Sequence, residues 1–171
     1  MLPVLFGVMA LFVVALVGFA LWTRRGESRP DPPGVRSVAT FRGGNLHILA
    51  EERAAEADEG RAALGKGLLS VLSDRLRAHG LSVDTPDRDD YGWGVILRAE
   101  GETAHLLLGA AEDEDAQPRW VLSVLDRAGG PGPRAVLAHV DTALHTIAGL
   151  EAIQWYERGD ESAAAASPVD D

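Results

Sequence analysis

The feature that most constrains this chain is an apolar run at residues 2–22, LPVLFGVMALFVVALVGFALW, which contains no charged residue. A helix of this length just crosses the hydrocarbon core of a bilayer, which is about 30 Å thick. Within lipid a segment must satisfy its own backbone hydrogen bonds, and a helix does so. A cleaved signal peptide is the alternative, but no basic residue precedes the run, which is also too long for the apolar region of such a peptide. The sequence therefore predicts a transmembrane helix at residues 2–22.

Basic residues directly after this run predict its orientation. Arg24, Arg25 and Arg29 follow the run, whereas no basic side chain precedes it. An excess of Arg beside a membrane segment marks the cytoplasmic face. We therefore expect a single-pass protein of a bacterial inner (plasma) membrane, with its N-terminus outside and its C-terminal domain in the cytoplasm. The lipid bilayer is then the partner of residues 2–22.

Changes in composition divide the rest of the chain. Residues 23–36 are rich in Pro, Gly and Arg, which predicts an extended basic spacer. Residues 37–157 have the apolar periodicity of a folded, acidic domain, and residues 158–171 lack any pattern that would bury surface, which is typical of a disordered tail. The net charge of −10 disfavours a nucleic-acid partner, because nucleic acids are themselves polyanions.

Hydrophobic spacing predicts two helices and about four strands within the acidic domain. One helix ends at His79, before Gly80, and a second begins at Pro133 and reaches residues 145–148. Residues 37–49 fit either a hairpin or a strand followed by a helix. The order of the elements indicates the α+β class, with an antiparallel sheet of about four strands and both helices on one face. The predicted strands are residues 91–99, 103–110, 120–125 and 152–156.

The first two of these strands predict a hairpin. We place a two-residue turn at residues 101–102, because Gly at the first position suits a type II′ turn. This register sets Leu97 opposite Leu106 on the buried face of the sheet. It also sets Ile96 opposite Leu107 on the other, half-polar face, which we expect to be partly exposed.

No residue pattern predicts a catalytic, cofactor or metal site. The chain has no Cys, which excludes disulfides and thiolate ligands. His139 and His145 lie six residues apart, on different faces of one helix, so they cannot chelate the same metal. Asp141 and His145 have the spacing of a surface pair, but no nucleophile motif accompanies them. The acidic stretch before Tyr91 fails the calcium-loop pattern, because Arg98 stands where a bidentate Glu is required.

These observations favour a binding domain over an enzyme. We expect the acidic domain to be a protein-interaction module, with a partner that is itself basic. One alternative is a membrane-anchored hydrolase or ligand sensor whose Asp and His groups converge only in the fold, and another is an inhibitor of a basic toxin. The residues expected to contact the partner are the acidic loop Glu112, Asp113, Glu114 and Asp115, together with Ile96 and Leu107 on the half-polar face.

Overall fold

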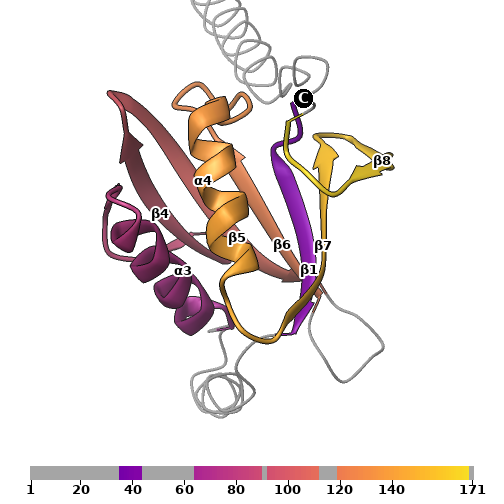
Figure 1. Ribbon diagram of the computed structural model, residues 1–171, viewed down its shortest axis with the longest axis horizontal. Helices are drawn as coiled ribbons and strands as arrows, with labels where there is room; N and C mark the ends of the chain where they lie inside the picture. Colours follow the sequence, from indigo (N-terminus) through magenta and orange to yellow (C-terminus); the bar gives the residue numbers. More distant parts are fainter. Residues whose placement is uncertain (1–34, 44–63, 90–91, 112–118, 170–171) are drawn as a thin grey trace, which may run out of the picture.

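Eight strands and two helices make up the part of the chain that the computed structural model describes, residues 35–43, 64–89, 92–111 and 119–169. The strands pair antiparallel in the order β2-β4-β5-β6-β1-β7-β8, and β3 pairs with β4 on the same edge as β2. Both helices cover one face of this sheet (Figure 1). In chain order the elements are β1 (Val38–Gly43), α3 (Lys66–Ala78), β2 (Ser82–Val83), β3 (Asp87–Asp89), β4 (Gly92–Ala99), β5 (Glu102–Ala111), β6 (Arg119–Leu125), α4 (Arg134–His145), β7 (Leu150–Glu157) and β8 (Asp160–Ala165).

The two helices form where hydrophobic spacing predicts them. α3 ends before Gly80, whose φ of 85° closes the helix, and the backbone N–H of Leu81 donates to the carbonyl of Leu76 at 3.2 Å. α4 begins directly after Pro133. The N–H groups at the start of a helix have no partner within the helix, so a proline, which has no N–H, loses no hydrogen bond there. Each helix buries one stripe, which in α3 comprises Leu68, Leu69, Leu72, Ser73 and Leu76 and in α4 Val136, Leu137, Val140, Ala143 and Leu144.

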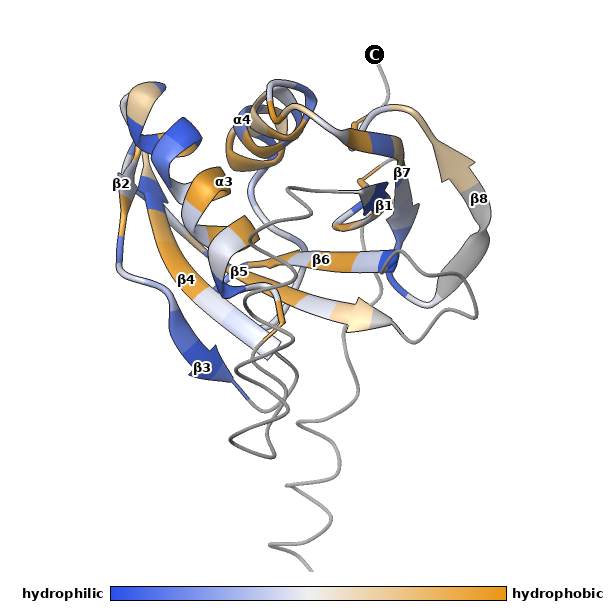
Figure 2. Ribbon diagram, turned by 90° about the horizontal axis from the view of Figure 1, so that it is seen from below, coloured by the Kyte–Doolittle hydropathy of each residue, from blue (hydrophilic) through white to orange (hydrophobic). Residues whose placement is uncertain are grey.

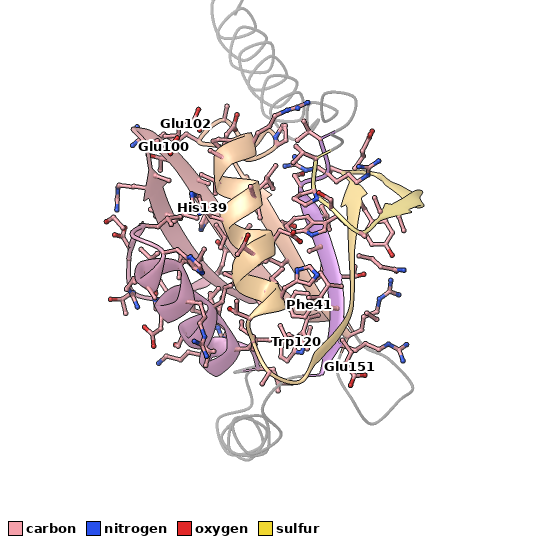
Figure 3. All side chains as sticks on the ribbon, in the orientation of Figure 1. Phe41, Glu100, Glu102, Trp120, His139 and Glu151 are labelled. Atoms are coloured by element: carbon pink, nitrogen blue, oxygen red, sulfur yellow. The ribbon has the colours of Figure 1, made fainter. Side chains whose placement is uncertain are left out.

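The core lies between the sheet and the helices. Phe41 and Trp120 pair across β1 and β6, on the face that the helices cover (Figure 3). Trp120 and Trp155 are both fully buried, and each indole N–H has a hydrogen-bond acceptor. The Trp120 Nε1–H donates to the carbonyl of Gly43 at 2.8 Å, and the Trp155 Nε1–H donates to Oδ1 of Asp141 at 2.7 Å. The core therefore satisfies the polar atoms of its largest side chains.

The prediction of about four strands is wrong, because the described residues form a sheet of eight. The predicted strands correspond to β4, β5, β6 and β7. β2 and β3 are too short and too polar to show an alternating pattern. β1 lies within residues 37–49, for which the sequence fitted either a hairpin or a strand followed by a helix. β8 lies within residues 158–171, which were predicted to be disordered. Gly159, with a φ of 80°, turns the chain there so that β8 pairs with β7.

The predicted membrane helix at residues 2–22 lies outside the described residues, as do Arg24, Arg25 and Arg29. Within the described ranges, no helix has the length and apolar character that crossing a bilayer requires. α3 and α4 instead each bury a single stripe and leave polar residues on the opposite side, whereas lipid requires an apolar surface all round. This finding goes against the predicted single-pass anchor and the inner-membrane localisation, which the described structure does not support. The lipid partner of residues 2–22 is not tested and stays a prediction.

The predicted register of the β4–β5 hairpin is wrong by two residues. The turn lies at residues 100–101, whose φ values of 52° and 84° are both positive, as in a type I′ turn. Leu97 therefore lies opposite Ala104, and Ile96 lies opposite His105. A shift of two leaves every residue on its predicted face, because side chains alternate with a period of two. Leu97 is accordingly buried, and Ile96 is exposed.

Candidate binding site on the open sheet face

The face of the sheet that points away from α3 and α4 is here called the outer face. Figure 2 shows both helices on the opposite side, so no helix of the described residues covers it. Its side chains mix apolar and polar groups, and most are half-buried or exposed, as on a sheet face that contacts solvent. On three adjacent strands it includes Gly94, Ile96 and Arg98 of β4, Thr103, His105 and Leu107 of β5, and Val121, Ser123 and Leu125 of β6.

Ile96 is the exposed large hydrophobic residue of the described part of the chain, with 40% of its surface accessible. It pairs with His105 of β5 on one side. On the other side its carbonyl accepts the backbone N–H of Asp84 at 2.9 Å, which brings the segment between β2 and β3 alongside. Ile96 therefore lies between His105 and the segment that contains Asp84.

A hollow of about 320 Å³ opens beside Ile96. Its floor is Gly94, which pairs with Asp87 of β3 and with Leu107 of β5. A Cβ built on Gly94 would lie 2.8 Å from Nε2 of His105 and 3.1 Å from Cδ2 of Leu107, so only glycine lets these side chains lie over the strand. The residues that line the hollow include Asp84, Asp87, Asp89, Ile96 and His105. Arg88, which pairs with Trp93 and so alternates to the opposite side of β3, also borders it.

One of the three carboxylates at the hollow is neutralised by an arginine. Asp84 and Arg98 form a bidentate pair, with Nη1 to Oδ1 at 2.7 Å and Nη2 to Oδ2 at 3.0 Å. The hydrogen bonds from Arg98 hold the pKa of Asp84 below its ordinary value, and the same bonds raise the pKa of Arg98. The pair fixes the segment between β2 and β3 against β4.

The other two carboxylates, Asp87 and Asp89, have no such partner. In the part of the chain that is described, no basic side chain lies within 4 Å of either one. Oδ1 of Asp87 accepts the backbone N–H of Arg88 at 2.8 Å, which orients the carboxylate without neutralising it. Nor do the described residues contain a group of three His, Asp or Glu side chains suited to a metal ion. The hollow therefore combines two carboxylates that are not ion-paired with a described basic side chain and an exposed apolar side chain.

The structure places two of the predicted contact residues on this face. Ile96 is exposed at the edge of the hollow, and Leu107 is half-buried beside Gly94. The acidic loop Glu112–Asp115 lies outside the described residues, so its contact with a partner stays a prediction. Sequence reasoning missed the association of Asp87 and His105, because these residues lie on different strands and share no motif.

The histidines of α4 lie away from the hollow, on the helix that covers the other face of the sheet (Figure 3). Nδ1 of His145 lies 2.9 Å from the backbone carbonyl of Asp141 and 3.5 Å from its Oδ1, so the predicted pair forms. The same carboxylate oxygen accepts the indole N–H of the buried Trp155. Asp141 therefore acts as a structural link between α4 and β7.

Comparisons of the chain with protein-family models, with curated proteins and with solved structures find no match in any of the three.

Proposed function

We propose that this domain is a protein-interaction module and that its partner binds the outer face of the sheet at the hollow. The observation that carries the proposal is the exposure of Ile96 at a hollow whose lining also includes Asp87 and Asp89. An exposed large apolar side chain costs solvation free energy in the free domain, and a partner that covers it recovers this cost. Contact surfaces typically combine such an apolar centre with charged groups around it.

The charge of the chain supports a basic partner. The net charge is −10, and at the hollow Asp87 and Asp89 add two carboxylates that form no ion pair with a described basic side chain. Complementary charge accelerates encounter and fixes the orientation of two proteins, and it does so most strongly at low ionic strength. A basic toxin is one partner of this kind, and its inhibition is a special case of the same proposal.

A ligand sensor is the second candidate, and the convergence of His105 with three aspartates at one hollow favours it. In that case the hollow would bind a small organic cation in place of a protein side chain. The interaction module remains the leading proposal. A small cation bound in the hollow would leave the exposed side chain of Ile96 uncovered, whereas a protein partner would cover it.

The proposal is tested by photocrosslinking in the cells that make the protein. A photoreactive amino acid replaces Ile96 in one variant and Ala138, which is exposed on α4, in a matched control. We expect one dominant protein adduct from position 96 and no such adduct from position 138. Adducts that are the same at both positions, or no adduct at position 96 in a correctly folded variant, would contradict the proposal.

A further inference from the structure

The hollow on the outer face is lined by carboxylates, an imidazole and an apolar side chain. We propose that it is a pocket for an arginine side chain of the partner, flanked in the partner by apolar residues that cover Ile96 and Leu107. This inference rests on the proposed function, and it names the chemistry that the outer face recognises.

Two carboxylates that are not ion-paired with a described basic side chain lie on one side of β3. Asp87 and Asp89 pair with Gly94 and Gly92, so both lie on the same side of β3. Residues two apart on a strand are separated by about 6.5 Å. A cation between them contacts one carboxylate with each side of its head group. Neither glycine has a side chain that would block this approach from the outer face.

The side chains of His105 and Ile96 form the walls of the hollow. Nε2 of His105 approaches the position of a Gly94 Cβ to 2.8 Å, so the imidazole lies over the glycine floor. Ile96, which pairs with His105, supplies an apolar wall beside it. A flat guanidinium stacks on an aromatic ring, and the aliphatic stem of an arginine packs on an apolar side chain.

The shape of its head group distinguishes an arginine from a lysine at this hollow. Five N–H donors in one plane can serve two carboxylates at once, whereas an ammonium group is a compact point charge. The domain already holds a guanidinium at the adjacent carboxylate, where Asp84 alone accepts two hydrogen bonds from Arg98 at 2.7 and 3.0 Å. That carboxylate is therefore occupied, which leaves Asp87 and Asp89 for the arginine of the partner.

The test uses the full-length, isotope-labelled chain and four synthetic probes of known composition. The first is the peptide acetyl-Leu-Arg-Leu-amide, and the second and third replace its Arg with citrulline, which is neutral and isosteric, or with Lys. The fourth is arginine amide, which lacks the flanking leucines. Binding is followed by the shifts of the backbone amide signals of Asp87, Gly94 and Ile96.

We expect the arginine peptide to shift these three signals and the citrulline peptide to bind at least about tenfold more weakly, because its neutral head group loses the charge-assisted hydrogen bonds. The lysine peptide should also bind more weakly, and arginine amide should bind more weakly than the arginine peptide. The double variant Asp87→Asn, Asp89→Asn should lose a similar factor. The control Asp74→Asn, which changes an exposed carboxylate paired with Arg77 on α3, should bind as the unmodified chain does.

Equal binding of the arginine and citrulline peptides, lysine binding as tight as arginine, or unchanged binding by the double variant would overturn the inference. Failure of the inference is distinguishable from failure of the proposed function. If position 96 crosslinks to a protein but the arginine peptide does not bind, only the pocket is wrong. If arginine amide binds as tightly as the peptide and position 96 crosslinks to no protein, the hollow is the site of a small cation, and both proposals are overturned.

Discussion

The imidazole of His105 lies so close to Gly94 that a Cβ on that glycine would be 2.8 Å from its Nε2. Gly94 does not have a positive φ, so a larger residue at this position would meet crowding by side chains and no backbone strain. We expect Gly94→Ala to lower the free energy of unfolding by no more than about 1 kcal/mol, because the crowded atoms are the far ends of the His105 and Leu107 side chains, which can shift on a half-exposed face. In the background of His105→Ala the same change should cost less. A double-mutant cycle by urea denaturation measures this coupling, and strict additivity would contradict the contact.

The two faces of β4 give a second prediction. Leu97 is fully buried, whereas Ile96 is 40% exposed. Leu97→Ala should therefore lower the free energy of unfolding by about 2–5 kcal/mol, the range for a buried large-to-small change. Ile96→Ala should cost much less, because most of the cavity it leaves is open to solvent. Chemical denaturation of the two variants measures the difference, and equal losses would show that the assignment of faces is wrong.

The hydrogen bond between Trp155 and Asp141 gives a third prediction. Asp141→Ala leaves the buried indole N–H of Trp155 without its acceptor, and this should lower the free energy of unfolding by about 1–3 kcal/mol. The control is Asp74→Ala, which removes an exposed ion pair with Arg77 and should cost less than about 1 kcal/mol. Thermal or urea unfolding compares them. Similar losses for the two variants would indicate that the Trp155 contact does not stabilise the fold.

The turn of the β4–β5 hairpin gives a fourth prediction. Glu100 has a φ of 52°, a conformation that asparagine adopts more readily than glutamate, and it lies at the tip of the hairpin (Figure 3). Glu100→Asn should raise the free energy of unfolding by a few tenths of a kcal/mol to about 1 kcal/mol. Gly101→Ala, at a φ of 84°, should lower it. A destabilising Glu100→Asn variant would contradict the type I′ turn.

The ion pair of Asp84 and Arg98 gives a fifth prediction, on pH dependence. Hydrogen bonds from Arg98 lower the pKa of Asp84 in the folded state, so the pair contributes stability above the ordinary aspartate pKa of about 3.9. That contribution is lost as pH falls through the lower pKa of the folded state. Arg98→Gln should raise the pKa of Asp84 toward its ordinary value. Carboxyl-carbon NMR titration measures the shift, and an unchanged Asp84 titration in this variant would contradict the pair.

The elements that could be predicted from sequence are those whose own residues carry the signal. The leucine stripe of α3 with Gly80 after it, and the alternation along β4, depend on local spacing alone. β8 consists of residues without large apolar side chains, and it forms because β7 offers it an open edge. Its existence is therefore a property of the tertiary structure.

The hairpin register shows a finer limit. Gly101 can occupy either position of a two-residue turn, and the two placements shift the register by two residues without moving any side chain to the other face. Burial could therefore be predicted, whereas the neighbours of Ile96 could not. The hollow depends on those neighbours, because it needs Gly94 between Asp87 and Leu107. This is why individual outer-face residues could be predicted but the site could not.

The proposed basic partner binds the outer face at the hollow. The most direct measurement is the rate of association between the full-length chain and the protein that crosslinks at position 96, from low to physiological salt, where the screening length is about 8 Å. We expect the rate to fall as salt rises, and we expect the variant Asp87→Asn, Asp89→Asn to associate more slowly and with a weaker salt dependence. An unchanged rate and an unchanged salt dependence in that variant would contradict the claim.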